Sequence, residues 1–303
     1  RDGQHIGTRE AAGMSEDDII TMMVGRELTA LYPNEPHATG DEVLRVENLT
    51  AWHPVNRHIK RVNNVSFSLH SGEILGIAGI SGNGQAELMA ALSGEDTVER
   101  HAIHLDGVPI GHLNAGQRRS KGLVFVPEER LGRGAVPAFS LSHNALLTAH
   151  RKGMKNWGLV RYSKAREFAE KCVARFDVRC GGHADDARSL SGGNLQKFIV
   201  GREIMLKPKL MIVAQPTWGV DVGASAVLRQ ALLDLSRNGV AILVISEELE
   251  ELFEISDRIA VLAQGRLSPA MPKSETNAET VGMMMSGLFD EAAAHKEAGH
   301  AFA

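Results

Sequence analysis

Three short apolar stretches constrain the fold of this chain more than any other feature. They are residues 74–78, 210–213 and 240–245. A short continuous apolar run bounded by turn residues is typical of a buried strand. Helical patterns lie between the runs, for example at 195–205, where Lys207 and Pro208 end the pattern. The alternation predicts a doubly wound α/β core of parallel strands, with ligands at the carboxyl ends of the strands.

A glycine-rich loop directly follows the first apolar run. Residues 79–86 read Gly-Ile-Ser-Gly-Asn-Gly-Gln-Ala, and a helical pattern begins at Glu87. Strand, glycine loop and helix is the context of a phosphate-binding loop, because free backbone N–H groups and the positive end of the helix dipole favour an anion. The candidate nucleotide-binding residues here are Gly79, Ser81, Gly82, Asn83, Gly84, Gln85 and Ala86.

A second polar turn opens into a helix at residues 190–197, Leu-Ser-Gly-Gly-Asn-Leu-Gln-Lys. Two adjacent glycines let the backbone approach a ligand closely, and the first helical turn offers unpaired N–H groups. The alternative explanation is an ordinary helix cap with a serine and two loop glycines. The candidate residues in this turn are Leu190, Ser191, Gly192, Gly193, Asn194 and Gln196.

The two glycine turns, the later strands and their order resemble the ABC ATPases. Residues 190–197 are similar to the signature motif of that family, and the Asn-Leu-Gln-Lys continuation is similar to its sugar-importer branch. The resemblance implies a P-loop NTPase core of ABC ATPase type, an antiparallel β subdomain and an inserted helical subdomain at about 130–188. Within that insert, residues 164–176 have the spacing of an amphipathic helix. Another Rossmann-like enzyme is the alternative reading.

The phosphate loop departs from the family at its two reactive positions. A working loop carries a lysine that reaches the β- and γ-phosphates and a hydroxyl that holds Mg²⁺. This chain has Gln85 and Ala86 there. Gln85 has no charge and Ala86 cannot ligate a metal. The glycine backbone could still accept a phosphate.

The other catalytic positions of the family depart as well. After the second strand, Ala214 and Gln215 stand where the resemblance implies a metal-supporting aspartate and a catalytic glutamate. Glu247 stands at the switch histidine and Glu128 at the metal-contacting glutamine. A glutamine cannot take a proton from water, and a carboxylate repels a γ-phosphate. We therefore expect no catalytic residue and no metal in this chain's own site, which should bind ATP or ADP weakly and not hydrolyse it.

The pattern of departures resembles the carboxy-terminal, degenerate half of the duplicated ATPase subunit of simple-sugar and nucleoside importers. The family's head-to-tail arrangement implies that the 190–197 turn, with Asp221 in the D-loop, completes the ATP site of the other half, where Mg²⁺ would be bound. The implied partners are that other half, transmembrane permease subunits and, indirectly, a periplasmic or lipoprotein substrate-binding protein. The implied location is the cytoplasmic face of the membrane. Trp218 departs from the arginine expected after Pro-Thr.

The two ends of the chain share a pattern. Gly3, Asp17 and Met22 match Gly265, Glu279 and Met284 at one constant offset, which is the mark of an internal repeat. Chance similarity of two Met-containing helices, the second with a cap at Asn277, is the alternative. We expect residues 1–27 to be the tail of a preceding homologous domain, 28–41 a linker, 42–290 the nucleotide-binding domain and 291–303 a frayed tail.

The segment after the linker alternates as antiparallel strands do, at residues 42–49 and 65–69. The resemblance implies that an aromatic ring in this region stacks on adenine. Trp52 is the nearest candidate, and simple packing of Trp52 against its loop is at least as good an explanation.

Composition narrows the classes of function. The net charge of −4 over 303 residues gives no general attraction to nucleic acid, and no apolar run approaches the roughly 20 residues of a spanning helix. Cys172 and Cys180 have no metal-ligand partners and are expected as buried or free thiols. Two other functions stay open: a soluble ABC protein of translation or DNA repair, and a nucleotide-free structural scaffold.

Overall fold

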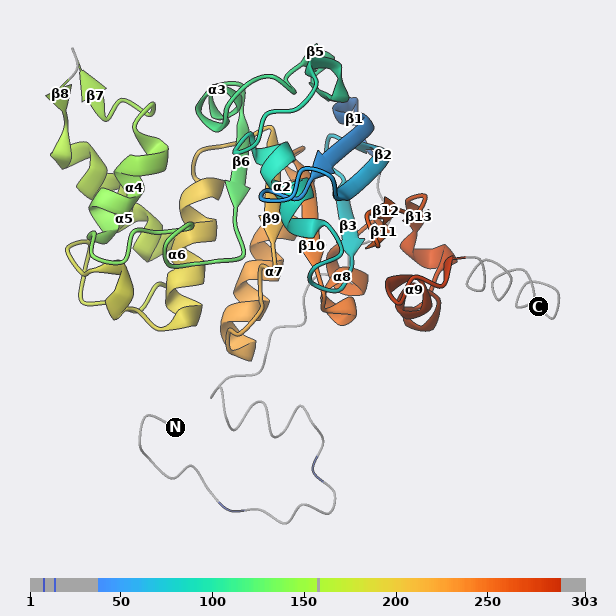
Figure 1. The fold of residues 1–303 in the computed structure, drawn as a ribbon. Coiled ribbons are helices and arrows are strands. Elements are labelled where there is room, and N and C mark those ends of the chain that lie inside the picture. Colours follow the sequence, from blue (N-terminus) through green and yellow to red (C-terminus); the bar gives the residue numbers. More distant parts are fainter. Residues whose placement is uncertain (1–7, 9–13, 15–37, 157–158, 290–303) are drawn as a thin grey trace.

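A central parallel sheet organises the chain in the computed structural model, which describes residues 8, 14, 38–156 and 159–289 (Figure 1). The parallel strands are β3 (Ile74–Ala78), β6 (Leu123–Val126), β9 (Leu210–Ala214), β10 (Ala241–Ser246) and β11 (Arg258–Ala263). Their order across the sheet is β11-β3-β10-β9-β6, and two short strands, β12 (Arg266–Leu267) and β13 (Met271–Pro272), pair antiparallel with β11. The three predicted buried strands are confirmed, since every residue of β3, β9 and β10 is buried.

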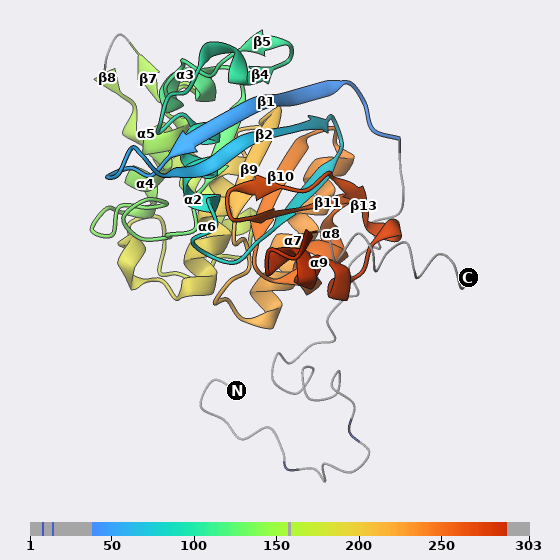
Figure 2. The ribbon, with the colours of Figure 1, turned by 45° about the vertical axis from the view of Figure 1, so that its right-hand side comes forward.

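A second, antiparallel sheet lies over one side of the parallel strands (Figure 2). Its strands are β1 (Glu42–Trp52), β2 (Lys60–His70), β4 (Ile103–Leu105) and β5 (Val108–Pro109), in the order β2-β1-β4-β5. The alternation predicted for residues 42–49 and 65–69 falls within β1 and β2. Val46 and Leu69 are buried, and neighbouring residues face outward, because successive side chains of a strand point to opposite faces.

Helices pack on the parallel sheet, and two of them, α4 (Leu141–Ala149) and α5 (Tyr162–Arg175), lie beyond its edge at one end of the molecule (Figure 1). The others are α2 (Gln85–Ser93), α3 (Ala115–Ser120), α6 (Gly192–Ile204), α7 (Val222–Arg237), α8 (Leu249–Ile255) and α9 (Ala278–Met285). Three short 3₁₀ turns complete the order, η1 (Arg100–Ala102), η2 (Ala187–Ser189) and η3 (Lys273–Glu275). No helix of the described residues is long and apolar enough to cross a lipid bilayer.

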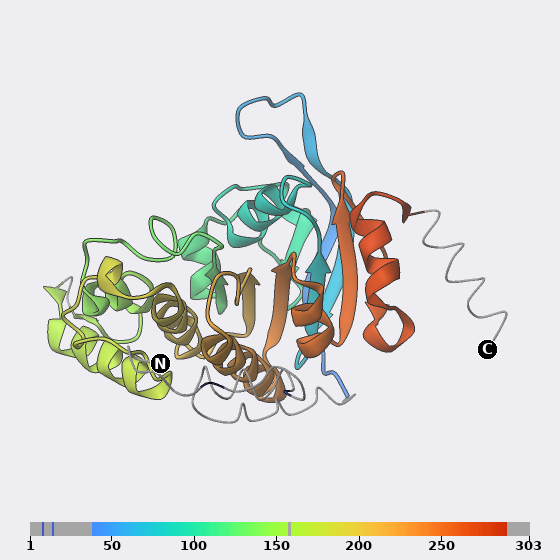
Figure 3. The ribbon, with the colours of Figure 1, turned by 90° about the horizontal axis from the view of Figure 1, so that it is seen from below.

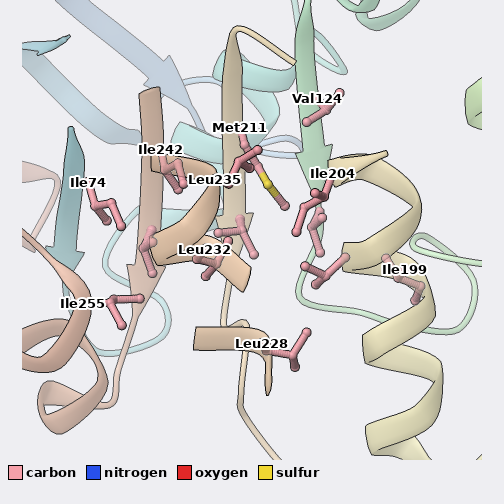
Figure 4. Packing of buried hydrophobic residues seen from close by; sticks show 14 of the residues in the cluster. Ile74, Val124, Ile199, Ile204, Met211, Leu228, Leu232, Leu235, Ile242 and Ile255 are labelled. Carbon is pink, nitrogen blue, oxygen red and sulfur yellow. The ribbon is translucent and has the colours of Figure 1, made fainter. Parts of the chain in front are cut away.

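Two apolar clusters lie on opposite faces of the parallel sheet. In β3, Ile74 and Ala78 belong to the cluster packed by α6, α7 and α8, whereas Leu75 and Ile77 belong to the cluster packed by α2 and the antiparallel sheet. Figure 4 shows strand and helix side chains meeting in the first cluster, including Leu232 of α7. Burying one such side chain stabilises the fold by about 1.5–3 kcal/mol. The alternation along each strand therefore ties both layers to one sheet.

The helices α4 and α5 lie at one end of the molecule and α9 at the other (Figures 1 and 3). The strands β7 (Lys155–Asn156) and β8 (Leu159–Val160) pair beside α4 and α5. The amphipathic helix predicted over 164–176 is confirmed as α5, which buries Cys172 and packs Phe168 and Val173 against the first cluster. Burial raises the pKa of the Cys172 thiol to about 12.

Most of the predictions for the two chain ends concern residues that the structure does not describe. The proposed tail at 1–27, apart from residues 8 and 14, most of the linker at 28–41, and the tail at 291–303 lie outside the described residues. The later copy of the repeat is described. Its predicted cap is confirmed, because the Asn277 side chain accepts a hydrogen bond from Thr280 N at the start of α9.

Candidate functional site

A cavity of about 270 Å³ opens at the carboxyl ends of β3, β9 and β10. Eight of the residues singled out in the sequence reach it, from four separate stretches of the chain. They are Ser81, Gly82, Gln85, Ala86, Glu128, Ala214, Gln215 and Glu247. The cavity also receives Arg61, Arg133, Glu87 and Glu129, so both signs of charge line it. Its place at the strand ends is where ligands bind in a sheet of this kind.

The glycine loop takes a conformation that its residues dictate. Gly84 caps α2 with a φ of 111°, and a side chain there would come within 2.2 Å of the Arg61 carbonyl oxygen. Such a backbone favours glycine. Asn83 fastens the loop to the turn after β11, because its side-chain oxygen accepts from Gln264 N at 3.0 Å and its carbonyl accepts from Gly265 N at 3.0 Å.

Gln85 folds back over the loop. Its Nε2 donates to the Ile80 carbonyl at 2.7 Å, and its Oε1 accepts from Asn83 N at 3.0 Å. A side chain on Gly79 would meet the Gln85 amide at 2.4 Å, so the amide lies directly against that glycine. The residue at the lysine position thus binds the loop's own backbone.

Glu247 brings a carboxylate to the same loop. It follows β10, whose last residue Ser246 pairs with Ala78 at the end of β3. The register sets the two strand ends side by side, and Glu247 Oε1 accepts from Ser81 N at 2.7 Å. A carboxylate oxygen on a backbone N–H is a charge-assisted hydrogen bond, the type that a phosphate oxygen makes. The Glu247 carboxylate therefore occupies a donor of the phosphate loop.

Gln215 is fixed by its backbone and by the turn after β10. Its φ of 47° lies in the left-handed region, and its side-chain oxygen accepts from Glu247 N at 3.2 Å and from the Ser246 hydroxyl at 3.3 Å. A backbone of this kind costs free energy, so the surrounding contacts must hold Gln215 in place. Ala214 precedes it in the cavity wall and offers no oxygen to a metal.

Glu128 completes the acidic side of the cavity. Partial burial raises the pKa of its carboxyl, and the negative charges of Glu129 and Glu247 raise it further against the opposing effect of Arg133. Glu128 itself is exposed at the cavity edge. Three carboxylates thus share this end of the cavity.

Sequence reasoning missed Glu251, whose side chain joins the turn after β9 to the end of β10 beneath the cavity. Its carboxylate is fully buried and accepts from the Thr217 hydroxyl at 2.7 Å and the Ser246 hydroxyl at 2.9 Å. Burial raises the pKa of Glu251 above its ordinary value, with Thr217 and Ser246 acting in the other direction. The run of glutamates after β10 was visible in the sequence, but nothing there separated the buried one from its exposed neighbours.

The 190–197 turn lies apart from this cavity, since none of its residues is among those lining it. Ser191 and Gly192 are exposed at the start of α6, and the Ser191 hydroxyl accepts from Asn194 Nδ2 at 2.9 Å. The serine side chain makes no capping hydrogen bond to the backbone of the helix, so it does not occupy the N–H groups of the first turn of α6.

The rest of the turn is anchored inward. The buried Gln196 amide donates to the Pro216 carbonyl at 3.1 Å, and a side chain on Gly193 would lie 3.0 Å from an Asp221 carboxylate oxygen. Asp221 caps α7 by accepting from Ala224 N at 2.9 Å. The structure therefore brings the turn of α6 next to Asp221, where the two motifs share one surface.

Arg130 is a second residue that sequence reasoning missed. Its guanidinium donates to the carbonyls of Trp218 and Gly219, and it lies where a side chain on Gly192 would come within 2.8 Å. Trp218 itself is 56% exposed. Arg130 thus joins the segment after β6 to the turn beside Asp221.

Trp52 stands outside the cavity. Among the described residues that line it, the neighbours His53 and Pro54 are present and Trp52 is not. The Trp52 ring is 41% exposed and lies under the Lys60 ammonium, 5.4 Å from the ring centroid. Stacking of this ring on adenine stays a prediction.

A family model described as "ABC transporter" matches residues 62–218, slightly more than half of the chain, and includes the phosphate loop, the start of α6 and the end of β9. The chain belongs to the ABC transporter family. The predicted fold is thereby confirmed, with the parallel core, antiparallel layer and helical insert of an ABC ATP-binding cassette.

Curated ABC proteins resemble the chain over most of its length. It is 48% identical over 272 residues to the xylose import ATP-binding protein XylG of Escherichia coli strain K12, a match covering 88% of this chain and 52% of that protein. The protein of the same name in Shigella boydii serotype 4 gives the same values. The chain spans about half the length of the curated relatives it matches.

Solved ABC cassettes share the fold. The cassette MJ1267 in its ADP conformation has a TM-score of 0.63 and 21% identity, covering 81% of this chain and 95% of that one. The cassette MJ0796, as a dimer bound to ADP and phosphate after hydrolysis, has a TM-score of 0.66 and 20% identity, covering 76% and 98%. At this identity the likeness concerns the fold alone.

Proposed function

We propose that this chain is the second ATP-binding cassette of a duplicated importer ATPase, inactive at its own phosphate loop and supplying its 190–197 turn to the other cassette. The observation that carries the proposal is the content of the cavity. Gln85, Ala86, Ala214 and Gln215 lie together there, at the positions where a hydrolytic cassette places its charged and metal-binding groups. The turn at 190–197, in contrast, keeps every residue type of the motif.

The residues of the cavity do not fit a Mg²⁺ ion at the motif positions. Ala86 and Ala214 carry no side-chain oxygen, and Mg²⁺ is bound through oxygen ligands in near-octahedral geometry. Gln215 has no basic oxygen, and its amide is already held by Glu247 N and the Ser246 hydroxyl. Nothing in this set can remove a proton from an attacking water.

The turn at the start of α6 has the properties that a shared phosphate site requires. Ser191 and Gly192 are exposed, and the first-turn N–H groups carry the positive end of a helix dipole. Placed against the terminal phosphate of an ATP held by the other cassette, these donors would stabilise the negative charge that develops during transfer. Asp221, beside Gly193, belongs to the same proposed interface.

The partners follow from the same assignment. The match to about half of each xylose import protein supports a companion cassette, and the name of those relatives supports a sugar as cargo, with a nucleoside as the alternative. A groove of about 190 Å³ lies between the core and the helical insert, with Leu147 exposed beside the paired side chains Arg133 and Glu95, and we assign docking of a transmembrane permease to it. A substrate-binding protein would act through that permease, on the far side of the membrane.

Turnover by the purified 303-residue chain tests the proposal. With Mg²⁺ and ATP at millimolar concentration, phosphate release should not exceed the background without protein, because the metal and base positions are empty of suitable groups. Steady turnover that is lost in Gln215→Ala would overturn the assignment. Titration of ATP into the chain distinguishes the proposal from a nucleotide-free scaffold, and co-purification with a permease distinguishes it from a soluble ABC protein.

A further inference from the structure

The phosphate loop is engaged by the chain's own side chains on two of its backbone donors. Ser81 N donates to the Glu247 carboxylate at 2.7 Å, and Asn83 N donates to the Gln85 side-chain oxygen at 3.0 Å. A loop that cradles phosphate does so with such N–H groups. A phosphate arriving here meets donors that are already paired.

The pairing of β10 with β3 positions Glu247 beside the phosphate loop. Glu247 directly follows β10, which runs parallel to β3 with five consecutive residue pairs ending at Ser246 and Ala78. Its backbone N–H is held by the Gln215 side chain at 3.2 Å. The carboxylate therefore stands at the end of β10, beside the loop that follows β3.

The phosphate loop has a positive charge on the side of the antiparallel sheet and negative charges on the side of β10. Arg61 donates to the Gly82 carbonyl at 3.2 Å on the side of the antiparallel sheet. On the side of β10 the cavity carries Glu247 and Glu128, and the charge of Glu247 is one of the causes that raise the pKa of Glu128. Arg133, which also lines the cavity, is already paired with two other carboxylates. A phosphate chain seated on the start of α2 and extending toward β10 would bring its terminal charge against these carboxylates.

We infer that Glu247 acts as an internal ligand of the phosphate loop, in place of a terminal phosphate, and makes this site select a nucleoside diphosphate over a triphosphate. The inference rests on the proposed function, in which the site does not hydrolyse ATP. It adds a physical reason why the site disfavours the substrate of the other cassette. Gln85 supports the arrangement by holding Asn83 N, and Glu247 carries the selectivity because it alone of the two has a charge.

Binding of fluorescent mant-ADP and mant-ATP to the 303-residue chain in EDTA tests the inference. The wild type should bind the diphosphate more tightly than the triphosphate. Glu247→Gln should bind the triphosphate about tenfold more tightly than the wild type, with a smaller gain for the diphosphate, because like charges at short range repel even through water-rich surroundings. Glu250→Gln, which removes an exposed charge in the next helix, is the matched control and should change neither affinity.

Each outcome decides the inference. Triphosphate binding as tight as diphosphate binding in the wild type overturns it and requires no variant. Equal gains for both nucleotides in Glu247→Gln, or no detectable binding of the diphosphate by the wild type, also overturn it. A larger gain for the triphosphate than for the diphosphate supports it. Should that variant fail to fold by circular dichroism, the wild-type comparison still decides. ATP turnover measured on the same samples reports separately on the proposed function.

Discussion

The chemistry of the site depends on single residues, and the environment of several of them follows from their burial in the folded chain. Glu251 shows this most clearly. Its carboxylate lies below the Thr217 and Ser246 hydroxyls, which place the turn before α7 and the end of β10 at a fixed separation. Both oxygens of the buried carboxyl are used, so it holds its two neighbours and carries no evident role in binding a ligand.

The raised pKa of Glu251 gives a signed prediction. Because the folded state binds the proton more strongly than the unfolded state, this group's contribution to stability is lost as the pH rises from about 4.5 toward the folded pKa. Glu251→Gln cannot titrate, so the free energy of unfolding of the variant relative to the wild type should increase across that interval. Urea unfolding at several pH values measures the difference. A constant difference would contradict the prediction, and Glu250→Gln, exposed on the same helix, is the control.

The sequence predicted the buried strands well, because their apolar composition alone indicates them. It did not predict the contacts between side chains that are distant in sequence. The strands at 74–78 and 210–214 are apolar throughout, so burial on both faces follows directly. The position of Gln85 depends on which loop atoms surround its amide, and the Glu247 contact joins residues 166 positions apart in the chain. Neither contact leaves a periodic trace in the sequence.

Whole elements are joined by a few buried cations. Arg118 of α3 is fully buried and donates to the carbonyls of Ala91 and Leu92 at the end of α2, and to Gly111 after β5. The last carbonyls of a helix lack partners within the helix and favour a positive charge. Burial lowers the pKa of Arg118 to about 10, which still leaves it charged at neutral pH. This one side chain therefore closes α2 and fastens the helix to the antiparallel sheet.

Removal of the Arg118 guanidinium should destabilise the fold strongly. Arg118→Met keeps apolar bulk but leaves buried carbonyls without donors, and we expect a loss of about 3–5 kcal/mol in the free energy of unfolding. Urea unfolding monitored by circular dichroism measures it. Arg100→Met, at an exposed arginine in η1, should change stability by no more than about 0.5 kcal/mol. Similar losses in the two variants would show that the buried contacts contribute little.

At the scale of the whole molecule, the cavity and the 190–197 turn occupy separate surfaces of one cassette. The residues of the turn do not line the cavity, and the turn shares its surface with Asp221 instead. A cassette arranged in this way can lose the chemistry of one surface and keep the other, because different side chains serve each. That separation supports the proposal that the two surfaces serve different ATP sites.

A substitution in the turn tests this separation in the proposed two-cassette subunit. Ser191→Arg places a bulky charge at the exposed start of α6, and we expect it to abolish ATP turnover although this chain's own phosphate loop is untouched. Lys164→Arg, on the exposed face of α5, is a control that should leave turnover unchanged. Phosphate release by the purified subunit is the measurement. Normal turnover in Ser191→Arg would remove the case for donation to the other cassette.

Helix α6 connects the exposed turn with the interior of the helical insert. The buried Arg202 near its end donates to the carbonyls of Asn144 and Gly134, and Lys197 in its middle donates to the carbonyl of Asp177. These contacts tie the middle and the end of α6 to the insert, so we expect a displacement of α4 to carry the exposed first turn at Gly192 with it, as a mechanical coupling between the two.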